Sequence, residues 1–236
     1  MSKPKAVISL FDLTGEAVKP WAEAGYDCFL FDIQHTEDVI LHGRCTVVGG
    51  DASTWAEPIA DIFSAYDVSI ILGFPPCTDL CVAGNRWRVA KAAANPRYIE
   101  EAMSLVYLVR DYGEQYGVPY MIENPIGLVS SEWRKPDYMF QPHQMGGYLP
   151  EDDTSPHPSV IPPRDAYTKK TCLWTGNGFR MPEARSVTPV KFQDKNGLNY
   201  SGPAFKLGGK SLRTKNIRSA TPRGFAKAVF EANGHD

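Results

Sequence analysis

The chain contains a series of short apolar runs, each followed by an aspartate, a glycine or a proline. Five of these runs are rich in β-branched and aromatic residues, which is typical of buried strands. They cover residues 5–11, 26–33, 44–51, 67–74 and 118–124. Residues 16–25 and 95–117 have helical spacing and end in glycine. Strands that alternate with helices predict an α/β fold with a doubly wound, mostly parallel sheet.

The second half of the chain is organised differently. Residues 135–163 are rich in proline and predict an extended loop with little regular structure. "KKTCLW" at 169–174 predicts one more strand, and "TPRGFAKAVFEAN" at 221–233 predicts a closing helix. With 236 residues, one sizeable domain with a small appendage is expected. We therefore divide the chain into a core (1–176), a short basic region (177–216) and a C-terminal helix that returns to the core (217–236).

The charges are distributed unevenly along the chain. Residues 1–163 hold 11 Lys and Arg against 22 Asp and Glu, whereas residues 164–236 hold 14 against 5. An acidic body followed by a basic segment favours contact with a polyanion, since phosphate neutralisation supplies most non-specific affinity for nucleic acids. The alternative is a solvated basic surface that offsets the acidic body.

Several classes of protein are disfavoured by the sequence. No stretch is long and apolar enough to span a bilayer, and no cleavage pattern of a secretory signal follows the N-terminal lysines. We expect a cytoplasmic protein and a monomer. An odd number of cysteines indicates reduced thiols. They stand at positions 28, 45, 77, 81 and 172. No pair of Cys or His with convincing spacing accompanies Cys77 and Cys81, so no metal is expected.

Polar residues collect where the predicted parallel strands end. "FDLTGE" follows the first strand, Asp32 the second, Asp51 the third, "PPC" the fourth and "ENP" the fifth. Ligands of open α/β sheets bind beyond the carboxyl ends of the strands. The candidate site therefore lies at this edge of the predicted sheet.

In their order and spacing these segments resemble those of the DNA (cytosine-C5) methyltransferases, in particular the small, often phage-encoded members. "LFDLTGEAVKPWAEAGY" is similar to the cofactor loop and helix of that family, "GFPPC" to its Pro-Cys nucleophile segment and "ENP" to its Glu-Asn-Val segment. The resemblance covers residues 9–124 loosely, and again residues 169–174 and the last helix. It implies a fold of the class I S-adenosylmethionine-dependent methyltransferase type with a small basic C-terminal appendage.

The chemistry of cytosine-C5 methylation needs the residue types found here. Carbon 5 is a poor nucleophile, so a thiolate must first add to C6, and Cys77 is the candidate. We expect the N-terminus of the next helix to lie nearby and to stabilise the thiolate. Glu123 is the candidate acid at N3 of the ring, with its pKa raised by burial. Asn124 is expected to orient either the loop or the edge of the cytosine.

The resemblance also implies a cofactor, S-adenosylmethionine, and a set of residues that bind it. Gly15 lets the backbone approach the methionine part, Asp32 bonds the ribose hydroxyls, and Asp51 contacts the adenine. The full set is Phe11, Asp12, Gly15, Asp32, Asp51 and Pro75.

DNA is the expected partner, and its candidate contacts come from three segments. Arg86 and Trp87 follow the nucleophile and are candidates for closing over a flipped base. In the "KKTCLW" segment, Lys169 or Lys170 is the candidate to replace the arginine that the family has on this strand, and Lys170 is included among the DNA contacts. The basic region contributes phosphate contacts, for which the candidates are Lys206, Lys210, Arg213 and Lys215. Because that region is short, we expect short or relaxed sequence specificity.

Alternative interpretations stay open at this point. Asp32 and Asp51 are also consistent with helix capping, and Glu123 with a core carboxylate paired with an arginine. We interpret the histidines as loop residues without a role, and Trp21, Trp55 and Trp174 as packing residues. Cys28, Cys45 and Cys172 are expected in the core. Alternative functions are methylation of free cytosine nucleotides, a DNA-binding relic without activity, and, with weaker support, an amino-group methyltransferase.

Overall fold

The computed structural model describes residues 2–36, 40–41, 43–82, 87–193, 197, 199–200, 207 and 211–234. It divides into two compact units. The sheet unit comprises Met1–Met139 and Thr171–Phe179, and the C-terminal unit comprises Phe140–Lys170 and Arg180–Asp236. Residues 140–170, which we had assigned to the core, thus group with the C-terminal part of the chain.

The sheet unit is built on an eight-stranded sheet with the order β3-β4-β2-β1-β5-β6-β8-β7. Its strands are β1 (Lys5–Leu10), β2 (Asp27–Phe31), β3 (Ile40–Leu41), β4 (Cys45–Val48), β5 (Asp67–Gly73), β6 (Tyr120–Pro125), β7 (Tyr138–Phe140) and β8 (Thr171–Gly176). Strands β4, β2, β1, β5 and β6 run parallel, whereas β8 is antiparallel to β6. This is the strand order of the class I S-adenosylmethionine-dependent methyltransferase fold, which confirms the predicted fold class.

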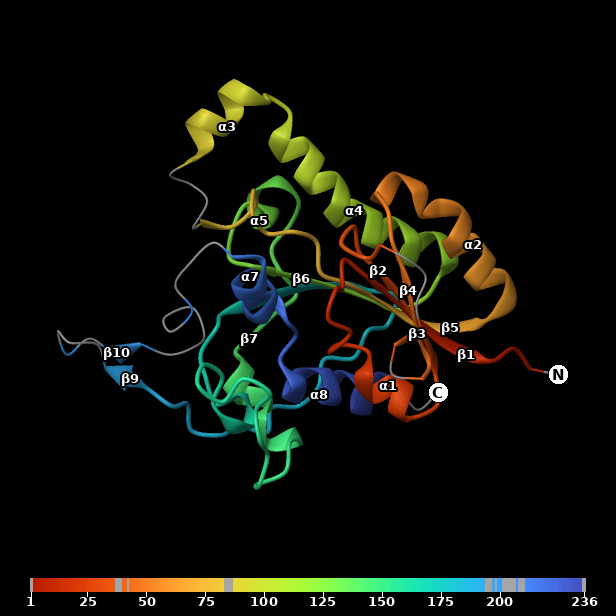
Figure 1. Cartoon of the computed structure of the whole chain (residues 1–236). Coiled ribbons are helices and arrows are strands. Elements are labelled where there is room, and N and C mark those ends of the chain that lie inside the picture. Colours follow the sequence, from red (N-terminus) through yellow and green to blue (C-terminus); the bar gives the residue numbers. More distant parts are fainter. Residues whose placement is uncertain are drawn as a thin grey trace. The chain divides into compact units, whose positions relative to one another are not determined.

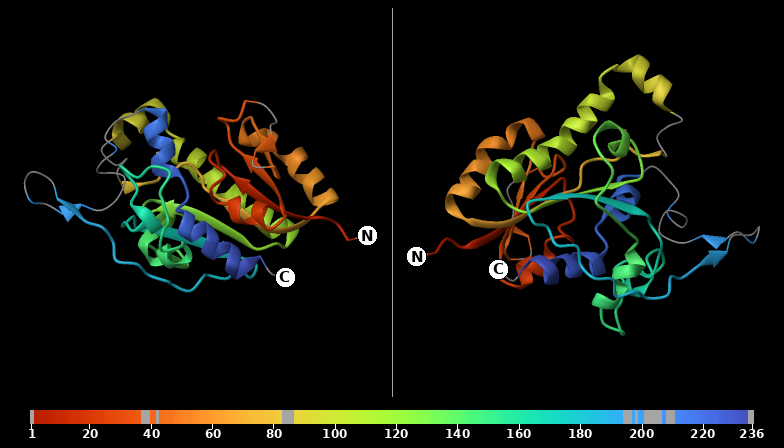
Figure 2. Two further views of the ribbon diagram at one scale, coloured as in Figure 1. Left: turned by 60° about the horizontal axis from the view of Figure 1, so that its bottom comes forward. Right: turned by 180° about the vertical axis from the view of Figure 1, so that it is seen from behind.

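Helices lie on both faces of the sheet. The α-helices described in the sheet unit are α1 (Lys19–Glu23), α2 (Ala56–Ala65), α3 (Arg88–Ala94), α4 (Tyr98–Tyr116) and α5 (Val129–Glu132). Helix α1 lies on one face of the sheet and α2 and α4 lie on the other, as Figure 1 shows. The view from behind in Figure 2 shows α2 and α4 lying across the same face. This agrees with the predicted doubly wound arrangement.

Two of these helices differ from the sequence-based expectation. The first predicted helix, residues 16–25, is reduced to the five residues of α1, which begins beside Pro20. Helix α2 was not predicted, although its Ile59 and Ile62 are buried at helical spacing. The long helix was predicted well: α4 ends at Tyr116, and the following Gly117, with a φ of +66°, terminates it in a left-handed conformation.

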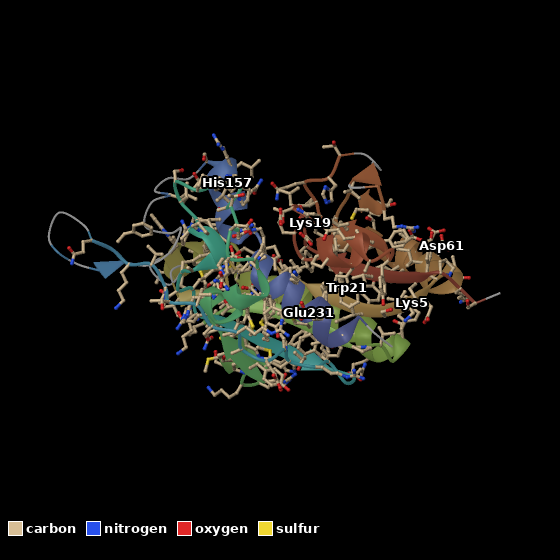
Figure 3. All side chains as sticks on the ribbon, turned by 90° about the horizontal axis from the view of Figure 1, so that it is seen from below. Lys5, Lys19, Trp21, Asp61, His157 and Glu231 are labelled. Atoms are coloured by element: carbon tan, nitrogen blue, oxygen red, sulfur yellow. The ribbon has the colours of Figure 1, made fainter. Side chains whose placement is uncertain are left out.

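The residues interpreted as packing residues lie in the core. Trp21, Trp55 and Trp174 are at most 1% exposed, and Cys28, Cys45 and Cys172 are buried as well. Figure 3 labels Trp21 in the interior of the sheet unit, on the same helix as the exposed Lys19. The predictions for these residues are confirmed.

The C-terminal unit is organised around α8 (Arg223–Asn233), close to the predicted closing helix. Phe225 of α8 stacks on Phe140 with ring centroids 4.0 Å apart. At the start of the helix, Arg223 makes two hydrogen bonds of 2.7 and 2.8 Å to the carboxylate of Asp153. Burial raises the pKa of the neighbouring Asp165, whose carboxylate accepts a hydrogen bond from the amide of Gly224 at 2.9 Å. These contacts fix the N-terminus of α8 within its own unit.

Candidate active site

The candidate residues of the sheet unit lie at one edge of the sheet. Because β1, β2, β4, β5 and β6 are parallel, their carboxyl ends meet at that edge. In the sheet, β2 and β4 lie on one side of β1, and β5 and β6, which come later in the chain, lie on the other side. The strand order therefore reverses between β1 and β5. This is the switch point at which open α/β sheets bind ligands.

The loop after β1 has an unusual backbone. Phe11 has a φ of +62°, a conformation that costs an ordinary residue about 1–2 kcal/mol. The amides of Phe11 and Asp12 both donate to the carbonyl of Phe31, at 2.6 and 3.2 Å. Gly15 also has a positive φ, +68°, and a Cβ at this position would lie 3.0 Å from Leu30. The loop is therefore held close to β2 in a strained conformation.

Asp12 orders this loop from inside. Its carboxylate accepts hydrogen bonds from the hydroxyl of Ser9 (2.9 Å) and from the amides of Thr14 (3.2 Å) and Gly15 (2.9 Å). Burial raises the pKa of the Asp12 carboxyl, although these hydrogen bonds act in the opposite direction. These hydrogen bonds show that Asp12 fixes the conformation of the loop. Contact between Asp12 and a cofactor stays a prediction.

Asp32 lies at the tip of β2 beside an exposed apolar residue. Its Oδ1 accepts a hydrogen bond from the amide of Gln34 at 2.8 Å, and Asp32 is only 8% exposed. The next residue, Ile33, is 68% exposed. A carboxylate beside an apolar surface suits a ligand that carries both hydroxyl groups and a flat ring.

His35 joins the loops after β1 and β2, a contact that sequence reasoning missed. Its Nε2 lies 3.3 Å from the carbonyl oxygen of Asp12, and its amide donates to the carbonyl of Asp32 at 3.1 Å. Since a carbonyl only accepts, Nε2 carries the proton in this contact. We had interpreted the histidines as loop residues without a role, and no pattern in the sequence distinguishes His35 from the others.

Asp51, after β4, caps a short helical turn. It precedes Ala52–Thr54, and its carboxylate accepts hydrogen bonds from the amide (2.9 Å) and the hydroxyl (2.7 Å) of Ser53. These hydrogen bonds hold the pKa of Asp51 below its ordinary value. The interpretation of Asp51 as a capping residue is therefore confirmed. Contact between Asp51 and an adenine stays a prediction.

Cys77 begins a hydrogen-bonded turn that we call the Cys77 turn (residues 77–81). The amides of Leu80 and Cys81 both donate to the carbonyl of Cys77, at 3.1 and 2.9 Å. Cys77 is exposed. The next helix, α3, begins at Arg88, and stabilisation of the thiolate by its N-terminus stays a prediction.

Asn124 fixes the approach to this turn. Its side-chain Nδ2 donates to the carbonyl of Pro75 at 2.8 Å, and Asn124 is 1% exposed. The register of β5 and β6 pairs Gly73 with Ile122, so two residues later Pro75 and Asn124 face each other. Asn124 was expected to orient either the loop or the edge of the cytosine. Its hydrogen bond to Pro75 supports the first of these two roles.

The chain after Asn124 holds the Cys77 turn by its backbone. The amide of Leu128 donates to the carbonyl of Leu80 at 2.7 Å, and the amide of Val82 to the carbonyl of Ile126 at 3.3 Å. A Cβ on Gly127 would lie 1.9 Å from the oxygen of Leu80, so only glycine permits this approach. The "PPC" and "ENP" segments thus form one backbone assembly.

Glu123 is half-buried on β6, directly before Asn124. It faces Leu173 across the antiparallel pair of β6 and β8. Because β5 and β6 are neighbours in the sheet, the structure brings the loop of Cys77 and the strand end of Glu123 together, as the sequence predicted.

The predicted DNA contacts are spread over both units. Trp87 is 53% exposed at the start of α3 in the sheet unit. In the C-terminal unit, Lys170 is exposed, and so are Arg213 and Lys215 on α7 (Leu212–Ser219). The other three candidates, Arg86, Lys206 and Lys210, lie outside the described residues.

The described part of the chain contains no group of three or more His, Cys, Asp or Glu side chains suited to a metal ion. None of the helices described is both long and apolar enough to cross a membrane.

Comparisons with known proteins add little to this geometry. No protein-family model matches the chain, and no curated protein matches its sequence. A crystal structure of the glycopeptide N-methyltransferase MtfA complexed with (S)-adenosyl-L-homocysteine aligns with a TM-score of 0.27 and 12% identity, over 92% of this chain and 72% of that one. A likeness this loose carries no argument. The assignment to the class I methyltransferase fold rests on the strand order.

Proposed function

We propose that this protein is a DNA cytosine-C5 methyltransferase that uses S-adenosylmethionine and has short or relaxed sequence specificity. The observation that carries the proposal is the hydrogen bond from Asn124 Nδ2 to the carbonyl of Pro75. Through it the strand end that bears Glu123 positions the loop that bears Cys77. A thiol and a carboxyl held on adjacent strand ends are what addition to a cytosine ring requires.

Each of these residues has a defined task in the proposed reaction. The thiolate of Cys77 adds to C6 of cytosine, which turns C5 into a carbanion-like centre. Glu123 holds a proton at N3 and so stabilises the charge that develops on the ring. Asn124 keeps the loop of Cys77 in register with Glu123. After the transfer, loss of the C5 proton and expulsion of the thiolate restore the aromatic ring.

The edge of the sheet fits S-adenosylmethionine. The strained loop that ends at Gly15 brings backbone close to the strand ends, and Asp32 offers a carboxylate to ribose hydroxyls. Ile33, largely exposed, provides an apolar surface for a purine ring. When bound, S-adenosylmethionine supplies an electrophilic methyl group.

Replacing Gly15 with alanine is expected to weaken cofactor binding about tenfold, because the added methyl group meets Leu30 and strains the loop at φ +68°. Gly25→Ala is the matched control, since Gly25 also has a positive φ, +96°, but nothing lies within 4 Å of its Cβ position. Both variants should lose about 1 kcal/mol of stability. Isothermal titration with S-adenosylhomocysteine and thermal unfolding separate the two effects. Equal affinity in Gly15→Ala and wild type would contradict the cofactor assignment of this loop.

The C-terminal unit supports a polyanionic substrate. Helix α7 begins at a Ser211 cap, whose hydroxyl accepts a hydrogen bond from the amide of Thr214 at 3.2 Å. Its cations, Arg213, Lys215 and Arg218, are exposed. Together with the basic charge of residues 164–236 they favour contact with phosphates. Phosphate contacts position a nucleic acid without reading its sequence.

The function is tested by trapping the covalent adduct. The protein is mixed with S-adenosylmethionine and a duplex or single-stranded oligonucleotide that contains 5-fluorocytosine, and the products are analysed by denaturing mass spectrometry. Fluorine cannot leave C5 as a proton, so an adduct that also carries a methyl group is expected. 5-Fluoro-dCMP is tested in parallel. An adduct with the nucleotide alone would favour the free-nucleotide alternative, and no adduct with any substrate would favour the inactive DNA-binding relic.

The chain is also expected to act as a monomer. Size-exclusion chromatography with light scattering tests this, with and without an oligonucleotide.

A further inference from the structure

Helix α3 lies at the outer end of α4 (Figure 1). None of the residues of α3 is buried, and Val89 is 86% exposed. A helix of seven residues is far too short to be stable by its own hydrogen bonds. Its position therefore depends on contacts between its side chains and the rest of the sheet unit.

Lys91 supplies such a contact, and the contact is to the Cys77 turn. The ammonium group of Lys91 forms an ion pair with the carboxylate of Asp79 and lies 3.4 Å from the carbonyl oxygen of Thr78. About a third of each charged side chain is exposed, 31% for Lys91 and 34% for Asp79. Thr78 and Asp79 directly follow the nucleophile in the chain.

The Cys77 turn is consequently held from two sides. On one side, the backbone bonds of Leu80 and Val82 to residues 126–128 attach it to the end of β6. On the other side, Lys91 attaches it to α3. The two residues that Lys91 contacts, Thr78 and Asp79, lie between Cys77 and the attachment at Leu80. Lys91 therefore restrains the part of the turn that the backbone bonds to residues 126–128 do not reach.

We propose that Lys91 is a positioning residue for Cys77: its contacts with Thr78 and Asp79 fix the turn that carries the nucleophile. This inference rests on the proposed function, in which Cys77 attacks the cytosine ring. Lys91 acts through the turn and touches neither substrate nor cofactor. Its loss displaces the thiol relative to the ring, so the chemical step is affected more than substrate binding. Displacements of about 1 Å cost enzymes up to about a hundredfold in rate.

Two variants and one control define the test. Lys91→Met keeps the length of the side chain and removes its charge, and Lys91→Arg restores the charge and the hydrogen bonds. Lys227→Met is the control, because Lys227 is an exposed lysine on α8 in the other unit. Amide hydrogen exchange at Leu80 and Cys81 reports on the turn, and steady-state kinetics separate kcat from KM.

In Lys91→Met we expect exchange at these two amides to be about tenfold faster and kcat about tenfold lower, with KM within about twofold of wild type. Lys91→Arg should recover most of both effects, and Lys227→Met should match wild type. The inference is overturned if exchange and kcat in Lys91→Met equal those of wild type, or if KM alone changes. If wild type transfers no methyl group to any substrate, the proposed function fails, while the exchange of Leu80 and Cys81 still decides whether Lys91 fixes the turn.

Discussion

Cys77→Ser is expected to abolish methyl transfer, with a fall in kcat of about 10⁴-fold or more. Serine keeps the size of the side chain, but its hydroxyl is far less acidic than a thiol and cannot supply the nucleophile at neutral pH. Because Cys77 is exposed and lies outside the core, the thermal unfolding temperature should stay close to that of wild type. Single-turnover transfer of a radiolabelled methyl group to DNA measures the effect.

Cys81→Ser is the matched control for this prediction. Cys81 closes the same turn through its amide, which donates to the carbonyl of Cys77 at 2.9 Å, and serine preserves that backbone bond. The variant should retain methyl transfer and form the adduct with 5-fluorocytosine. If Cys81→Ser were inactive and Cys77→Ser active, the nucleophile would be Cys81 and the proposed mechanism would have to be rebuilt around it.

Glu123→Gln is expected to lower kcat by about 10²–10⁴-fold and to change KM little. Glutamine has nearly the shape of glutamate and keeps β6 intact, but it cannot hold a titrating proton at N3 of the ring. Steady-state methyl transfer over a range of DNA concentrations gives the two constants. Glu132→Gln, at the exposed end of α5, changes the same functional group without touching the site and should behave like wild type.

The opposite result for Glu123 has a clear meaning. If Glu123→Gln lowered the unfolding temperature and left kcat unchanged, the carboxylate would be a structural partner inside the sheet unit. That is the alternative which the sequence left open, and the acid would then have to come from another residue.

Six strands, β1, β2, β4, β5, β6 and β8, were predictable because each is rich in apolar residues and at least half buried. In β1, for example, four of the six residues are apolar and five are buried. Strand β7 was not predicted, because two of its three residues are exposed and it lies in the segment expected to be an extended loop. The direction of β8 was not predictable, since an antiparallel strand beside β6 is as apolar as a parallel one. Helix α2 was missed for a different reason: it is short and contains Pro58, which a helix tolerates only in its first turn.

The candidate site was predictable only as far as it follows the strand ends. Cys77 lies four residues after the end of β5, and Glu123 and Asn124 lie in the last half of β6. The parallel order of these neighbouring strands brings their ends together. His35 and Lys91 were missed because their contacts join segments that no local pattern links. The hydrogen bond from His35 spans 23 residues to Asp12, and that from Lys91 spans 13 residues to Thr78.

The internal bonding of the loop after β1 has a consequence for ligand affinity. With its carboxylate engaged by Ser9, Thr14 and Gly15, Asp12 sets the course of this loop before any ligand arrives. The conformational entropy of these residues is then lost during folding and not again during association. A small molecule that meets such a preorganised surface needs few contacts to be retained, and its release leaves the surface unchanged for the next one.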